Sequence, residues 1–102
     1  MTMRAPAAIL LRAAHSHLYP GSVVTAENVP ARIAAPHPAV IEFADGSGAA
    51  ATLSPLADGA LELAVDTYVT HARHAVAARC WRLRAVDAVR AGWRVERRLP
   101  AT

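Results

Sequence analysis

The residues of this chain best suited to bind a ligand are its histidines and arginines. Five histidines occur in 102 residues, arranged as His15-x-His17, His37 and His71-x-x-His74. Neutral imidazole binds transition metals well, and His71 and His74 could converge across a turn. His15 and His17 would point apart on a helix, and no residue at a fixed spacing supplies the third ligand that a metal site needs. We therefore expect no metal site, and His71 and His74 are the candidates that remain if a metal is bound.

Positive charge gathers near the C-terminal end of the sequence. Lysine is absent, and seven of the eleven arginines lie between residues 79 and 98. Against Asp87 and Glu96 they give this stretch a formal charge of +5, while four arginines against six acids give −2 elsewhere. The candidate residues for binding a polyanion or a protein partner are Arg79, Arg82, Arg84, Arg94, Arg97 and Arg98, with Tyr68 as an exposed aromatic ring. A bacterial-like, G/C-rich genome also explains abundant Arg and Ala without any binding function.

Catalytic and cofactor motifs are absent from the sequence. There is no Gly-x-Ser-x-Gly elbow, phosphate loop, His-Glu-x-x-His or Cys-x-x-Cys. Glu62 and Asp66 are four residues apart, which on a strand separates them by about 13 Å, too far for a shared dyad. Cys80 is the single cysteine, so no internal disulfide forms, and no base can be placed beside it. We predict a protein that is not an enzyme, with no catalytic residue and no cofactor.

The residues that could bind must be positioned by one small domain covering residues 1–102. The hydrophobic content is 54%, but twenty-five residues are Ala, which bury little area each. Large apolar side chains are therefore few. Covering one face with a second subunit would add burial, which favours a homodimer or a protein partner.

The first segment, residues 5–18, is predicted to form a helix. Pro6 suits a first helical turn, and Pro20-Gly21 ends the element. Apolar residues recur at helical spacing on one face: Ala7, Leu10, Leu11, Ala14 and Leu18. Arg12 interrupts the apolar run, so we do not expect a secretory signal or a membrane span. The predicted location is cytoplasmic.

Residues 20–38 are expected to form an irregular, proline-rich connection, and residues 39–99 an antiparallel sheet. From residue 39 the apolar residues alternate, and Asp45-Gly46 and Asp58-Gly59 mark tight turns. Trp81 and Trp93 share a phase with Leu83 and Val95 and are expected in the core, while the intervening arginines face outward. The predicted fold class is α+β, with the helix packed on a curved meander of about five strands.

These expectations favour a small binding module over the other functions. An open sheet edge or face would bind a second protein or a second copy of the chain. The alternative is an Arg-rich surface that binds nucleic acid or another polyanion, and a histidine-based metal-binding protein is the third class. Arginines crowded on one sheet face need either interspersed acids or an anionic partner.

Overall fold

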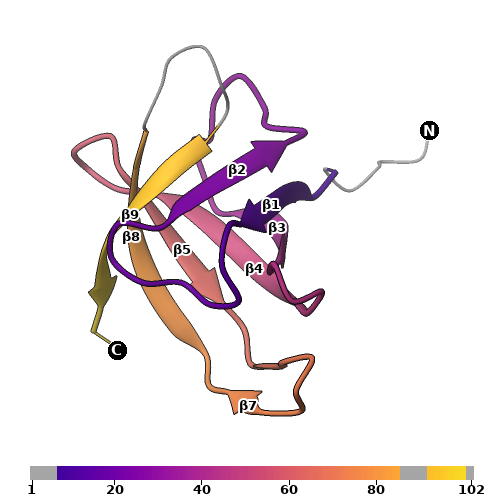
Figure 1. The fold of residues 1–102 in the computed structure, drawn as a ribbon. Coiled ribbons are helices and arrows are strands. Elements are labelled where there is room, and N and C mark those ends of the chain that lie inside the picture. The colour runs from indigo at the N-terminus through magenta and orange to yellow at the C-terminus, as the bar shows by residue number, and fades with distance from the viewer. Residues whose placement is uncertain (1–6, 86–91, 101–102) are drawn as a thin grey trace.

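The computed structural model describes residues 7–85 and 92–100, which form nine strands and no helix (Figure 1). In chain order the strands are β1 (Ile9–Ala13), β2 (Val23–Glu27), β3 (His37–Glu42), β4 (Gly48–Pro55), β5 (Leu61–Val65), β6 (Tyr68–Val69), β7 (Ala75–Val76), β8 (Arg79–Ala85) and β9 (Gly92–Leu99). No helix in the described ranges is long and apolar enough to cross a membrane.

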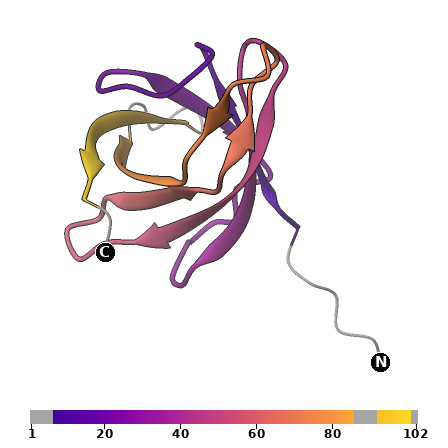
Figure 2. The ribbon, with the colours of Figure 1, turned by 90° about the horizontal axis from the view of Figure 1, so that it is seen from below.

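Seven of the strands close into a barrel in the order β1-β2-β9-β8-β5-β4-β3. Figure 2 shows these strands curving around a common interior. Strand β1 pairs antiparallel with β2 and parallel with β3. The barrel closes where β2 meets β9, with Val23, Val24 and Thr25 opposite Arg94, Trp93 and Gly92. Strands β6 and β7 form a separate two-stranded hairpin, and we call residues 68–76 the arm.

The core fills the barrel because alternate residues of every barrel strand point inward. Strand β1 shows the pattern, since Ile9, Leu11 and Ala13 are buried while Arg12 is exposed. The inward residues form one cluster: Ile9, Leu11, Ala13, Val24, Ala39, Ile41, Ala49, Ala51, Leu53, Leu61, Leu63, Val65, Trp81, Leu83, Trp93 and Val95. The interior therefore contains both the large indoles of β8 and β9 and the small alanines of β3 and β4. The expected burial of Trp81 and Trp93 is confirmed.

The expected α+β fold with a helix over residues 5–18 is wrong. Residues 9–13 form β1, and residues 14–18 form a loop whose Leu18 is buried; residues 5 and 6 lie outside the described ranges. The run from Ile9 to Ala13 satisfies a period of two as well as a helical period. Pairing with β2 on one side and β3 on the other settles the choice, because tertiary context overrides local propensity.

The expected five-strand meander is also replaced by the closed barrel. The segment at residues 20–38 contains β2 and the start of β3, so it supplies barrel wall as well as connection. Asn28 ends β2 in a left-handed conformation, with φ of 62°. The two Asp-Gly turns are where they were predicted, with φ of 89° at Gly46 and 87° at Gly59. They connect β3 to β4 and β4 to β5, each pair antiparallel.

Candidate functional site

Arg82 and Arg84 of β8 lie on the outer face of the barrel, opposite Arg97 and Arg94 of β9, and part of this charge is neutralised by acids. Arg82 pairs through Nε with Glu96 Oε2 at 3.0 Å, and its Nη2 pairs with Asp58 Oδ2. Arg84 Nε pairs with the second oxygen of Glu96. A register shift between Arg82 and Leu83 leaves Glu96 as an extra residue on β9, which places it between the two guanidinium groups.

These ion pairs shift the ionisation of the groups that make them. Hydrogen bonds from Arg84 and then Arg82 lower the pKa of Glu96 below its ordinary value. The hydrogen bond from Arg82 likewise lowers the pKa of Asp58. The Arg82 side chain is 14% exposed and the Arg84 side chain 59%. Arg82 is therefore engaged in a partly covered cluster and is poorly placed to receive a polyanion.

Three other arginines of the predicted site remain exposed on β9. Arg94, Arg97 and Arg98 form no ion pair with any carboxylate of residues 7–85 and 92–100. Arg94 lies opposite Arg84 across the strand pair, and Arg97 lies opposite Arg82. Within the predicted arginine set, Arg82 and Arg84 on β8 are thus neutralised, while Arg79 on β8 and Arg94, Arg97 and Arg98 on β9 have no ion pair with a described carboxylate.

Tyr68 is not the exposed ring that the sequence suggested. It is partly buried, and its ring stacks on Phe43 with centroids 4.7 Å apart and planes 14° from parallel. Burial raises the pKa of Tyr68, the charge of Asp45 raises it further, and the charge of Arg79 opposes the rise. Phe43 itself is buried at the end of the barrel, so this stack attaches the arm to the barrel end.

A hydrogen bond from a backbone amide to a side-chain carboxylate gives the arm its second attachment. The amide of His71 donates to Asp45 Oδ2 at 3.4 Å, linking the turn of the arm to the turn between β3 and β4. Figure 2 shows these two turns side by side. Within the arm, Thr70 and His74 close the hairpin, and Arg73 adopts a left-handed φ of 67°. The arm is thus held at one end of the barrel by few contacts.

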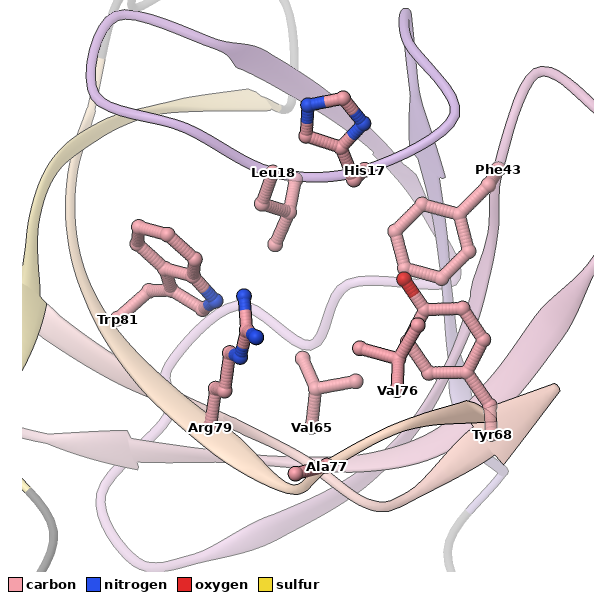
Figure 3. Close-up of a pocket in the computed structure, with 9 residues that line it drawn as sticks. All are labelled: His17, Leu18, Phe43, Val65, Tyr68, Val76, Ala77, Arg79 and Trp81. Carbon is pink, nitrogen blue, oxygen red and sulfur yellow. The ribbon is translucent and has the colours of Figure 1, made fainter. Parts of the chain in front are cut away.

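A hollow of about 30 Å³ lies between the arm and the loop at residues 14–18 (Figure 3). We call it the barrel-end hollow. Its lining residues are His17, Leu18, Phe43, Val65, Tyr68, Val76, Ala77, Arg79 and Trp81. Arg79 and Trp81 are two apart on β8, so both side chains leave the same face of the strand. Figure 3 shows the Arg79 guanidinium and the Trp81 indole nitrogen pointing into the hollow.

A wider and shallower groove continues from the hollow along the arm. It shares His17, Tyr68, Val76 and Arg79 with the hollow. Its other lining residues are Ser16, Asp45, Thr70, Ala72, His74 and Ala75. We call it the arm groove. More polar side chains line the groove than the hollow, although both expose more apolar than polar surface.

The metal candidates His71 and His74 both lie in the turn of the arm. Their backbone amides are used, His71 by Asp45 and His74 by the Thr70 hydroxyl. Among the described residues no three His, Cys, Asp or Glu side chains lie close enough to hold a metal ion. His71 and His74 therefore lie in the arm, and the described residues provide no set of metal ligands around them.

The hollow contains residues that sequence reasoning treated only as core, helix or turn. Phe43, Leu18 and His17 were not candidates, and Trp81 was expected only as core. One signal was available: Tyr68 is out of phase with the buried residues Leu63 and Val65 of β5. That phase break marks the point where the chain leaves the barrel for the arm.

Comparison with known protein families, with curated proteins and with solved structures found no significant match to this chain.

Proposed function

We propose that this domain is a non-enzymatic protein-interaction module that binds an extended segment of a partner along the outer edge of β7. The observation that carries the proposal is the closure of the barrel. Closure pairs barrel strands with one another and removes most free edges. The arm lies outside the barrel sheet, and the outer side of β7 has no strand neighbour among the described residues. An open edge beside an apolar hollow suits strand addition.

The hairpin register supports Ala75 as the residue that would meet the added strand. Thr70 N–H donates to His74 O, which makes these two residues a hydrogen-bonded pair. Such pairs alternate with non-bonded pairs in an antiparallel ladder. The next pair, Val69 with Ala75, is therefore non-bonded, and the backbone N–H and C=O of Ala75 point away from β6. Ala75 also lines the arm groove.

The test is an Ala75→Pro variant. Proline removes the outward N–H of β7 but leaves the ladder between β6 and β7 intact, since that N–H takes no part in it. We expect Ala75→Pro to lose partner binding and Ala75→Val, which keeps the donor, to retain it. Light scattering shows whether a second copy is the partner, because a dimer of the wild type would then become a monomer in Ala75→Pro. Equal binding by Ala75→Pro and the wild type would contradict the proposal.

A second candidate function, polyanion binding, is favoured by the uncompensated arginines on β9. Arg94, Arg97 and Arg98 offer three exposed guanidinium groups on one strand. Among the described residues, no exposed aromatic ring lies beside these arginines to stack on a base, because Trp93 is buried. This favours contacts to phosphates without base recognition. It would produce binding with strong salt dependence and little sequence preference.

We also propose a cytoplasmic location. The single cysteine, Cys80, is a free thiol and is partly buried. Burial, followed by the charge of Glu62, raises its pKa above the ordinary value. A thiol of this kind is mostly protonated and slow to oxidise, which suits a reducing compartment.

A further inference from the structure

The barrel-end hollow holds two nitrogen donors for which the described residues supply no acceptor. Arg79 forms no ion pair or side-chain hydrogen bond with another described residue, and the Trp81 indole N–H forms none either. Among the described residues, no buried side-chain nitrogen or oxygen lacks a hydrogen-bond partner. The indole N–H has no partner among the described residues, so its nitrogen is not fully buried, and Figure 3 shows it facing the hollow. Both donors are thus available to something that enters.

Asp66 lines a separate hollow together with Arg79, and Asp45, which lines the arm groove, is already engaged elsewhere. Asp45 Oδ1 accepts hydrogen bonds from the amide of Ser47 at 2.9 Å and from the Ser47 hydroxyl, and Oδ2 accepts from His71. These bonds build the turn between β3 and β4 and lower the pKa of Asp45. Arg79 therefore has no ion-pair partner among the described residues, and Asp45, in the adjoining arm groove, is held in place by other partners.

The walls around the donors are apolar. Leu18, Val65, Val76 and Phe43 line the hollow, and Leu18, Val65 and Phe43 are each at most 6% exposed. The hollow offers about 30 Å³, well below the roughly 300–1,000 Å³ of ligand pockets. That size excludes a whole metabolite and admits only a small side chain. Arg79 is exposed at the rim of these apolar walls, and its charge-assisted hydrogen bond to a carboxylate would strengthen as a bound segment displaces water.

We propose that the segment bound along β7 carries an apolar side chain next to a carboxylate. The apolar side chain fills the barrel-end hollow, and the carboxylate accepts from the Arg79 guanidinium and the Trp81 indole N–H. Arg79 is then the residue that determines specificity. This inference rests on the proposed strand addition and identifies the chemistry of the segment. Charge complementarity supports it, since the arm groove and the hollow offer Arg79 as a free cation to the incoming chain.

The experiment is a selection of random dodecapeptides displayed on phage against the whole domain. We expect enriched peptides to share a small aliphatic residue adjacent to Asp or Glu, because the hollow is too small for an aromatic ring. The best peptide is then synthesised beside a twin in which that acid is replaced by its amide. Affinities are measured from Trp81 fluorescence in a Trp93→Phe background, so that one indole reports. The acidic peptide should bind about tenfold or more tightly than its amide twin, as expected for a charge-assisted bond.

A matched pair of protein variants assigns the effect to Arg79. In Arg79→Met the acidic and amide peptides should bind alike, because the cation is gone while the aliphatic length is kept. Arg94→Met removes the same charge from the outer face of β9 and should leave the tenfold preference unchanged. Circular dichroism of both variants establishes that they fold.

The possible failures are distinguishable. In one case, the peptides bind the wild type but not Ala75→Pro, and they either show no preference for the acid or bind Arg79→Met like the wild type. This result would overturn this inference and leave strand addition in place. Peptides that bind Ala75→Pro as well as the wild type, or a selection without enrichment, would overturn strand addition and this inference with it.

Discussion

Tyr68 of the arm lies flat on Phe43 at the barrel end, with ring centroids 4.7 Å apart. Phe43 is buried and directly follows β3, so one face of the Tyr68 ring rests on the core. The arm is also attached by the hydrogen bond from His71 to Asp45, by the proximity of β6 to β4 and by the covalent connections to β5 and β8. The aromatic pair is the attachment that one substitution can remove, and it helps to set the position of the arm and the shape of the hollow.

Replacing Tyr68 by Ala should release the arm without unfolding the barrel. An aromatic pair contributes about 0.5–1.5 kcal/mol beyond its buried area, which corresponds to roughly a 2- to 10-fold rise in the open population. Trypsin should then cut after Arg73, at the exposed turn of the arm, faster by that factor. Mass spectrometry of the early fragments identifies the site. Tyr68→Phe keeps the stack and should be cut at the wild-type rate, and equal rates for Ala and Phe would show that the stack does not hold the arm.

Acid should weaken the fold partly through Glu96. Its pKa in the folded protein is lowered by Arg84 and Arg82, so its contribution to stability is fully present above the ordinary value of about 4.3. The contribution is lost as the pH falls through the lower, folded-state value. Urea unfolding between pH 7 and pH 3 should show a smaller loss of stability for Glu96→Gln than for the wild type. Identical pH slopes would mean that the ion pairs contribute nothing measurable.

If the exposed arginines of β9 bind polyanions, DNA affinity should depend on them. The affinity is measured by anisotropy of a labelled duplex at several salt concentrations. Changing Arg94 and Arg97 to Gln should lower the salt slope by about one for each phosphate that is no longer neutralised. Arg32→Gln with Arg73→Gln removes the same charge from exposed loops and should leave the slope unchanged. Equal reductions in the two double variants would assign the binding to net charge alone. Arg82 is unsuitable for this test, because its removal would leave Asp58 without its ion-pair partner.

Gly92→Ala should destabilise the barrel at the contact between β2 and β9. A Cβ at this position would lie 3.1 Å from the carbonyl oxygen of Val24, a backbone atom of the neighbouring strand. The strands cannot separate without losing their pairing, so we expect stability to fall by about 1–3 kcal/mol, as for overpacked sites. Chemical denaturation measures this change. Ala50→Gly, at an exposed position of β4, is a control for the general cost of glycine in a strand. A neutral Gly92→Ala variant would show that the two strands are loosely packed here.

The sequence predicted the parts of the fold that are held by local signals. Alternation in residues 40–43, followed by Asp45-Gly46, was sufficient to predict the hairpin of β3 and β4. Residues 9–13 were misassigned because Leu10 and Leu11 fit a helical stripe, while Ile9, Leu11 and Ala13 fit a strand period of two. The partners that decide between the two are β2, which begins ten residues after β1 ends, and β3, which begins 24 residues after it, so the pattern within residues 9–13 contains neither.

The candidate site was predicted in part for the same reason. Strand periodicity placed Arg82, Arg84 and Arg94 on the outer face, and one of the two outcomes considered for crowded arginines was that acids lie between them. Glu96 fills that role because of a bulge, which alternation alone cannot locate. The barrel-end hollow was beyond prediction. It requires Leu18, Phe43 and Trp81 to meet, and each comes from a different part of the chain.

The junction of β2 and β9 also determines how this protein must fold. Residues 23–25 pair with residues 92–94, so most of the described chain lies between the two strands that complete the barrel. Pairing between residues this distant in sequence carries a high entropic cost of loop closure and slows the folding of β proteins to milliseconds or seconds. Until that junction forms, β2 and β9 expose unpaired backbone, and the folding intermediate is vulnerable to aggregation in a way that the finished barrel is not.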